Sequence, residues 1–171
     1  MSAYVPSDNA LDGIAKPIHL ASNESPIGPS ALALDAARSS MDRMHLYPDA
    51  LSSALTSAIA AHHNISPSWI LCGTGSESLI EVICRTYAGV GDEVLMPMHA
   101  FPMFSIYARA TGAHVVFADA PRFTTDVSAL LACVTDRTRV IFIANPNNPT
   151  GTYIDGAQLD QLVNGLPEHV L

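Results

Sequence analysis

Lysine is almost absent from this sequence: Lys16 is the only one among 171 residues. Lysine and arginine together number 8, against 16 aspartates and glutamates, which gives a formal net charge of −8. A protein that binds nucleic acid needs a basic face to neutralise phosphates, so this balance argues against that class. The acidic excess indicates ordinary solubility.

Long apolar runs are also missing. Hydrophobic residues make up 49% of the chain, yet no uninterrupted apolar run reaches the roughly 18 to 20 residues that would span a bilayer. Residues 1–12 carry two aspartates and no basic residue, which is unlike a secretory signal peptide. We therefore expect a cytoplasmic protein that does not associate with membranes.

Cysteine is scarce, and its spacing excludes the common metal and disulfide patterns. Cys72, Cys84 and Cys133 are widely separated, no Cys-x-x-Cys motif is present, and the histidines are scattered. We expect no metal site, and three buried thiols in a reducing compartment.

The first part of the chain differs in composition from the rest. Residues 1–28 are rich in Ser, Asn and Pro and are predicted to form an extended N-terminal arm. Residues 29–171 are predicted to form the body. A helical pattern covers 29–44, and Asp49 is expected to cap a second helix that carries the next apolar residues at helical spacing.

Strands and helices then alternate. The predicted strands cover 69–72, 93–96, 114–118 and 139–143. One predicted helix follows the turn at 73–77 and carries Leu79 to Tyr87, and the others cover 102–110, 126–133 and 155–164. The apolar run after Arg139 is typical of a strand covered on both faces. The predicted fold is therefore α/β, a three-layer α/β/α arrangement around a mainly parallel sheet.

Three segments directly follow predicted strands, where ligands bind in such sheets. Gly73-Thr74-Gly75-Ser76-Glu77 is a strand-to-helix turn, whose glycines and free N–H groups suit a phosphate. A plain tight turn explains this segment about equally well, because it is neither a Walker loop nor a Gly-x-Gly-x-x-Gly motif.

The other two segments are an asparagine-rich loop and an aromatic turn. Asn145-Pro-Asn-Asn-Pro-Thr-Gly151 places three asparagines beside two rigid prolines, which favours a ligand over a purely structural turn. Phe101, in the segment from His99, has a ring that could stack on a flat ligand, although a core role is the commoner one for phenylalanine.

The loop at 145–151 strongly resembles the signature of fold-type I pyridoxal-phosphate aminotransferases. Three further segments, in the right order and at the right separations, are similar to the histidinol-phosphate aminotransferase branch: Leu20-Ala-Ser-Asn-Glu-Ser-Pro26, Tyr47-Pro48 and Gly73-Thr-Gly-Ser-Glu77. The resemblance covers nearly the whole chain. It implies that residues 29–171 are the first part of the large domain that binds pyridoxal 5'-phosphate, truncated, with residues 1–28 as the arm.

The resemblance also implies roles for single residues around the cofactor. Ser76 and Glu77 are expected to present backbone N–H groups to the phosphate, although Glu77 would equally suit the helix dipole as an acid in the first turn. Phe101 stands where the family stacks an aromatic ring on the pyridine. Asn148 is expected to hydrogen-bond the phenolic oxygen, and the Asn148–Pro149 bond is predicted to be cis.

Two residues near the N-terminus complete the implied site. Tyr47 is expected to reach the phosphate in the partner subunit of a homodimer, with packing in a Tyr-Pro loop as the alternative. Asn23 lies in the arm that closes over a small-molecule substrate in the family, and is taken as substrate-binding.

The resemblance also requires a lysine that bonds covalently to the cofactor, and Lys16 does not match its position. No catalytic residue is therefore assigned; the lysine is expected beyond Leu171, and the isolated chain is expected to be incomplete and inactive. The complete enzyme would transfer an amino group between L-histidinol phosphate and 2-oxoglutarate in histidine biosynthesis. The alternatives are an aromatic amino-acid aminotransferase, a threonine-phosphate decarboxylase-like enzyme, and a non-catalytic remnant or partner-completing subunit.

Overall fold

The computed structural model describes residues 22–171. Its contacts divide the chain into two compact units, Met1–Asp49 and Ala50–Leu171. This division lies at a different place from the expected boundary after residue 28, which stays a prediction. In the described part of the first unit, α1 (Ala31–Ser40) and the 3-10 helix η1 (Met41–Arg43) confirm the predicted helical segment. Ser30 caps α1 by accepting a hydrogen bond from the N–H of Ala33 over 3.2 Å.

The second unit opens with α2 (Ser53–His63) and the 3-10 helix η2 (Pro67–Trp69). The prediction that Asp49 caps α2 is wrong. Ser52 is the capping residue, in a left-handed conformation with φ 49° and ψ 41°, so the helix starts only at Ser53. Asn64 ends α2, also in the left-handed region, which asparagine tolerates better than most residues.

A three-stranded sheet forms the centre of this unit. It contains β1 (Glu93–Pro97), β2 (His114–Ala118) and β3 (Thr138–Ile141) in the order β2-β1-β3, and both pairings are parallel. The parallel sheet confirms the prediction.

The fourth predicted strand, at 69–72, is wrong. Ile70 has extended backbone angles, with φ −116° and ψ 125°, but no strand among residues 22–171 pairs with it. Without a neighbour in the hydrogen-bonding direction an extended segment is not a strand. Trp69 and Leu71 remain 79% and 72% exposed.

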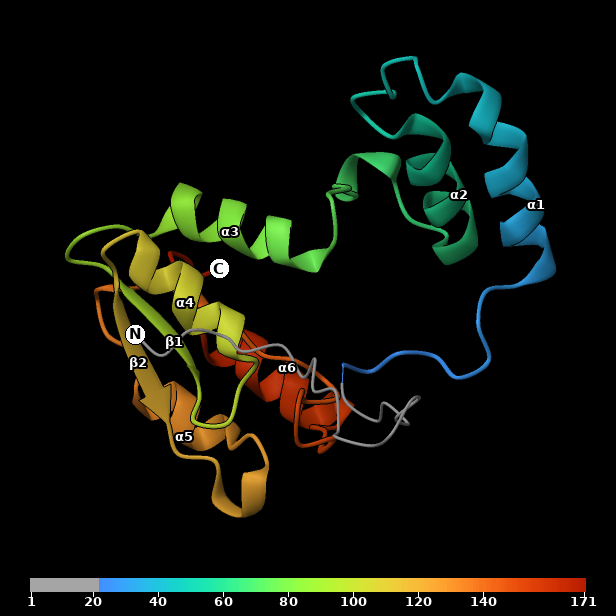
Figure 1. Cartoon of the computed structure of the whole chain (residues 1–171). Helices are drawn as coiled ribbons and strands as arrows, with labels where there is room; N and C mark the ends of the chain where they lie inside the picture. The colour runs from blue at the N-terminus through green and yellow to red at the C-terminus, as the bar shows by residue number, and fades with distance from the viewer. Residues whose placement is uncertain (1–21) are drawn as a thin grey trace, which may run out of the picture. The chain divides into compact units, whose positions relative to one another are not determined.

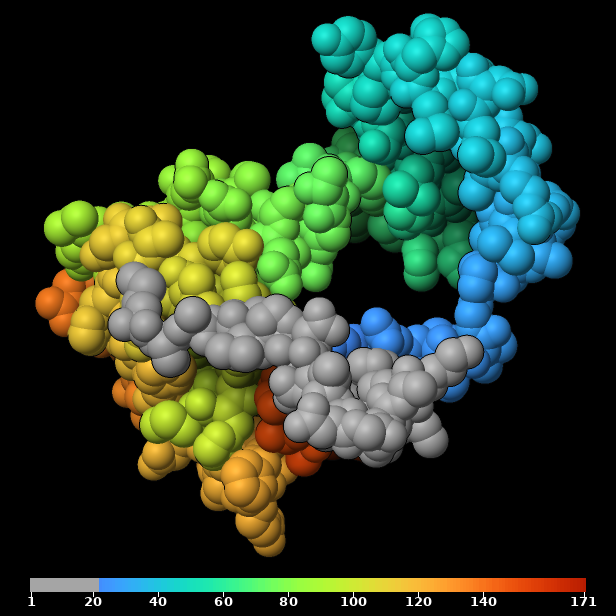
Figure 2. Space-filling model, viewed as in Figure 1, coloured from blue at the N-terminus to red at the C-terminus, as the bar shows by residue number. Residues whose placement is uncertain are grey.

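Helices cover both faces of the sheet (Figure 1). α3 (Ser76–Tyr87) and α4 (Pro102–Ala110) pack on one face, and α5 (Val127–Ala132) and α6 (Gly156–Gly165) pack on the other, with the 3-10 helix η3 (Pro121–Phe123) before α5. Figure 2 shows the outer faces of α3 and α4 at the surface (green and yellow). The predicted α/β/α layers are confirmed.

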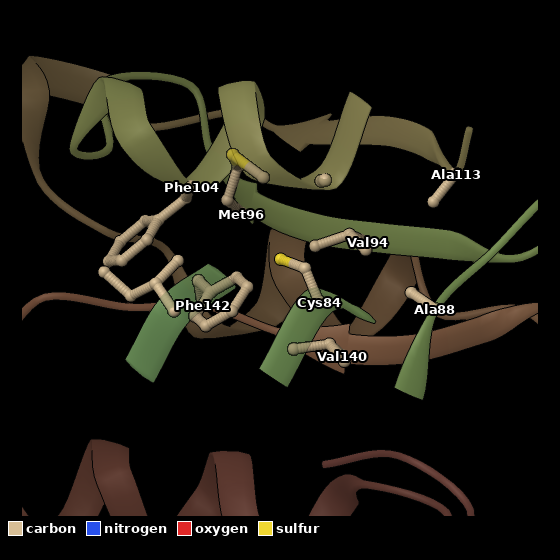
Figure 3. Close-up of a cluster of buried hydrophobic side chains, with 10 residues drawn as sticks. Cys84, Ala88, Val94, Met96, Phe104, Ala113, Val140 and Phe142 are labelled. Atoms are coloured by element: carbon tan, nitrogen blue, oxygen red, sulfur yellow. The ribbon is translucent and has the colours of Figure 1, made fainter. Parts of the chain in front are cut away.

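The core under α3 and α4 is apolar and closely packed. Phe104 and Phe142 stack nearly parallel, with ring centroids 4.7 Å apart and an interplanar angle of 10° (Figure 3). Cys84 lies in the same cluster and is completely buried, which raises the pKa of its thiol. All three cysteines are free, but Cys72 and Cys133 are only half-buried, so the expectation of three buried thiols is wrong for these two.

After α6 the chain returns to the outer edge of β3. Leu171 donates its N–H to the carbonyl oxygen of Arg139 over 2.9 Å, and Ile141 donates its N–H to the carbonyl oxygen of Leu171 over 2.8 Å. Bonds to two residues that flank one position are the pattern of a parallel pair. Among residues 22–171, none of the helices combines the length and apolar character that a membrane span requires.

Candidate functional site

The three predicted ligand segments meet at the carboxyl edge of the sheet. β1 and β3 are parallel, so the segments after Pro97 and Ile141 leave the sheet at the same edge. Residues 88–92 connect α3 to the amino end of β1. Because the 12 residues of α3 span about 18 Å, close to the length of the neighbouring strands, its first turn lies near the carboxyl edge.

The turn before α3 has the features of an anion site. Gly75 is the capping residue, with φ 87° and ψ 164°, and no side chain caps the helix. The first N–H groups of a helix have no intrahelical partner, so those of Ser76 and Glu77 are available to a ligand. Both residues are exposed. Gly73 has a separate role, because a Cβ there would lie 2.6 Å from the hydroxyl of Ser78.

The side chain of Glu77 is close enough to α4 to affect a tyrosine there. The half-buried Tyr107, on α4, lies beside it. Burial raises the pKa of Tyr107, and the negative charges of Glu77 and Glu81, with a hydrogen bond to Glu77, raise it further. A carboxylate is negatively charged and only accepts hydrogen bonds, so the backbone N–H is what Glu77 offers to an anion.

The Asn145–Gly151 loop uses two of its three asparagines to hold its own shape. Asn145 donates from Nδ2 to the carbonyl oxygen of Ile154 and accepts from the N–H of Ile154, both over 3.0 Å. Asn147 donates from Nδ2 to Thr150 Oγ1 over 2.8 Å. The Asn145–Pro146 and Asn148–Pro149 bonds are both cis, and the second confirms the prediction.

Asn148 is different from the other two asparagines. Its side chain is half-buried and makes no hydrogen bond with any residue in the described range 22–171. An amide carries two donors and an acceptor, all of which a ligand could use here. The residue pattern alone does not distinguish the three asparagines, and the family resemblance singles out Asn148. The structure also separates Asn148 from the two asparagines that build the loop.

Phe101 is the residue that precedes α4. Its half-buried ring packs edge-to-face on Phe104, with centroids 5.7 Å apart and an interplanar angle of 87°. It therefore joins the margin of the core and still keeps accessible surface, so a structural role and a ligand-stacking role are compatible.

The two remaining predicted residues belong to the first unit. Tyr47 is fully exposed, and Asn23 is exposed with φ 54°. Within the second unit, the structure brings Ser76, Glu77, Phe101 and Asn148 to one edge.

A cleft that sequence reasoning missed lies beside the ends of β1 and β2. Its volume is ≈ 480 Å³. The His99 ring, on its wall, lies 4.8 Å from the ring of Phe123. No motif in the sequence marks this cleft, since its walls come from three separate segments: Met98, His99, Asp119, Ala120, Pro121, Asp126 and Ala129.

The whole second unit and part of the first match a known family model, described as aminotransferase class I and II, over residues 15–171. The chain belongs to the class I and II aminotransferase family. Within this family it is 44% identical to histidinol-phosphate aminotransferase of Paramagnetospirillum magneticum over 168 residues, and 45% identical to that of Ruegeria pomeroyi over 161. These alignments cover 98% and 94% of this chain, and 46% and 45% of the relatives.

A solved aminotransferase structure also matches this chain. Histidinol-phosphate aminotransferase from Sinorhizobium meliloti, in complex with pyridoxal-5'-phosphate, superposes with a TM-score of 0.84 at 28% identity. The match covers 88% of this chain and 41% of that one. The chain therefore has an aminotransferase fold, and it spans about half the length of the curated relatives that it matches.

Proposed function

We propose that the carboxyl edge of this sheet is one part of a pyridoxal 5'-phosphate site. The observation that carries the proposal is the unused amide of Asn148, half-buried in a loop whose other two asparagines are hydrogen-bonded. A second feature supports it: α3 starts at a glycine, with no side chain competing for its first N–H groups.

The residues present fit this cofactor by their chemistry. The N–H groups of Ser76 and Glu77 would bind the phosphate, the Phe101 ring would pack on the pyridine ring, and the Asn148 amide would donate to the phenolic oxygen. When bound, pyridoxal phosphate supplies an electron sink for the carbon that loses a proton. The chain's own contribution is to bind and orient that ring.

We propose further that the complete enzyme transfers an amino group between L-histidinol phosphate and 2-oxoglutarate, in the cytoplasm. The relatives named above are histidinol-phosphate aminotransferases, which supports this substrate over the aromatic amino-acid and decarboxylase alternatives. Asn23 would contact the substrate, and Tyr47 would reach the phosphate of the partner subunit in a homodimer. The full exposure of Tyr47 is compatible with a role in a second subunit.

Equilibrium binding tests the cofactor proposal. Pyridoxal phosphate is titrated into the purified chain and into the Asn148→Ala and Phe101→Leu variants by calorimetry. Loss of a hydrogen bond or of a ring contact should weaken binding about tenfold in each. Asp119→Asn, in the neighbouring cleft, is the control and should bind like the wild type. Binding that is equal in all four proteins, or no binding by the wild type, contradicts the proposal.

A further inference from the structure

Asn147 is the one buried residue of the Asn145–Gly151 loop, at 5% exposed. Its N–H donates to the carbonyl oxygen of Thr152, and its carbonyl oxygen accepts from the N–H of Gly151, both over 2.7 Å. Its side-chain Nδ2 donates to Thr150 Oγ1 over 2.8 Å and to the carbonyl oxygen of His99 over 3.0 Å. A single residue thus closes the loop on itself and joins it to the segment after β1.

The bond to His99 determines the orientation of the Asn147 amide. A backbone carbonyl oxygen only accepts, so Nδ2 must face His99 and Oδ1 must face elsewhere. Oδ1 is buried and has no hydrogen-bond partner in the described part of the chain. A buried acceptor without a donor is unfavourable and calls for an explanation. The two hydrogen bonds that Nδ2 donates therefore fix the orientation of the amide. Oδ1 remains a free acceptor, because none of residues 22–171 donates to it.

We infer that Asn147 is a positioning residue, which holds Asn148 and Phe101 in a fixed relation across the carboxyl edge. The inference rests on the proposed function, in which those two residues bind the cofactor ring. Asn148 follows Asn147 in the chain, and Phe101 lies two residues after His99. The bond between Asn147 and His99 therefore joins the two ring-binding segments almost directly. Without this hydrogen bond, Asn148 and Phe101 would move independently, each with its own loop. The binding site for the cofactor ring would then no longer be preformed.

Amide hydrogen exchange of the chain without cofactor tests the link itself. Asn147→Asp keeps the size of the side chain but places an oxygen opposite the carbonyl oxygen of His99. We expect exchange to rise about tenfold at Ala100, whose N–H donates to the carbonyl oxygen of Pro97 over 3.1 Å. Asn148→Ala, the matched control in the same loop, should leave exchange at Ala100 unchanged. Unchanged exchange at Ala100 in Asn147→Asp overturns the inference.

Titration separates positioning from general damage. Asn147→Asp should bind pyridoxal phosphate about tenfold more weakly than the wild type. Its affinity for inorganic phosphate, which would use the turn at 73–77, should be unchanged. Equal losses for both ligands overturn the positioning role. If the wild type binds no pyridoxal phosphate, the proposed function fails, while the exchange at Ala100 still decides whether Asn147 links the segments.

Exchange at Leu95, in the middle of β1, reports whether the variants keep their fold. If Asn147→Asp also loses protection there, Asn147→Ala repeats the test without the charge. We expect Asn147→Ala to raise exchange at Ala100 and to leave Leu95 protected. Loss of protection at Leu95 in both variants would mean that Asn147 holds the whole unit together, and would overturn the specific positioning role.

Discussion

Arg137 and Glu93 form an ion pair at the amino edge of the sheet, with the guanidinium Nη2 2.6 Å from Oε1 of Glu93. Glu93 is only 3% exposed. Its other oxygen accepts from the hydroxyl of Thr135, also over 2.6 Å. The hydrogen bond from Thr135, together with Arg137, lowers the pKa of Glu93 although burial opposes the shift. This cluster joins β1 to the segment that leads into β3.

The lowered pKa makes the stability of the chain depend on pH in the acid range. A carboxyl group with a depressed folded-state pKa stabilises the protein above its unfolded pKa. That contribution disappears as the pH falls from about 4.3, the ordinary pKa of glutamate, through the lower folded-state value. We expect the free energy of unfolding, measured in urea, to fall over this range in the wild type and to fall less in Glu93→Gln.

At pH 7 the same variant should be less stable than the wild type by about 1–3 kcal/mol, because a buried charged hydrogen-bond network is broken. Glu81→Gln is the matched control, because Glu81 forms an ion pair with the exposed Arg85 one turn along α3. This variant should change the free energy of unfolding by less than about 0.5 kcal/mol. If Glu93→Gln is as stable as the wild type at pH 7, the cluster contributes nothing to the free energy of unfolding.

Gly112 is a position where a side chain cannot be accepted. Its φ is +84°, and a Cβ there would lie 2.7 Å from Cγ2 of Val90. We expect Gly112→Ala to lower the free energy of unfolding by about 1–3 kcal/mol. Gly156, the first residue of α6, has no positive φ, and a Cβ there would meet nothing within 4 Å. Gly156→Ala should therefore be neutral or slightly stabilising. If Gly112→Ala and Gly156→Ala change the free energy of unfolding in urea equally, the two glycines do not differ in this way.

The outer edge of β3 is largely unpaired, which predicts that the purified chain self-associates. Apart from Leu171, no residue of the described range pairs with this edge, and exposed apolar side chains such as Trp69 and Val163 lie elsewhere on the same unit. Open edges and apolar surface favour association. We expect concentration-dependent self-association in sedimentation velocity and binding of the dye ANS. A monodisperse monomer that binds no dye would be evidence against this view.

The lysine content of the chain predicts that the purified chain has no aminotransferase activity. Lys16 is the only lysine and lies outside the described residues. With no lysine at a matching position, the purified chain should not convert histidinol phosphate and 2-oxoglutarate to products. Lys16→Arg should bind pyridoxal phosphate as tightly as the wild type. Turnover that borohydride reduction with the cofactor abolishes, or weak binding by Lys16→Arg, would show that Lys16 takes part.

Local patterns in the sequence were enough to predict most of the second unit. β1, β2 and β3 are apolar runs between helices with clear starts, such as the one capped by Asp155 and Gln158. The segment at 69–72 has the same local character. It failed as a strand because a strand depends on a neighbour, which no local pattern reveals.

The site was predicted less completely, and for a similar reason. Ser76, Glu77, Phe101 and Asn148 were predicted from motifs, and their roles at the site stay predictions. The bond from Asn147 to His99, which carries the proposed positioning role, was not predicted, because it joins residues 48 positions apart in the chain. The effect of the Glu77 charge on Tyr107 likewise acts between two helices, and neither segment alone predicts it.

The most direct test of the cofactor site is a titration of the ¹⁵N-labelled chain with pyridoxal phosphate, followed by amide chemical shifts. The predicted result is that the largest shifts fall on Ser76, Glu77, Phe101 and Asn148, with those of the first two reproduced by inorganic phosphate. Shifts confined to other residues, such as those around the His99 cleft, or no shifts at all, would contradict the assignment of the carboxyl edge as the cofactor site.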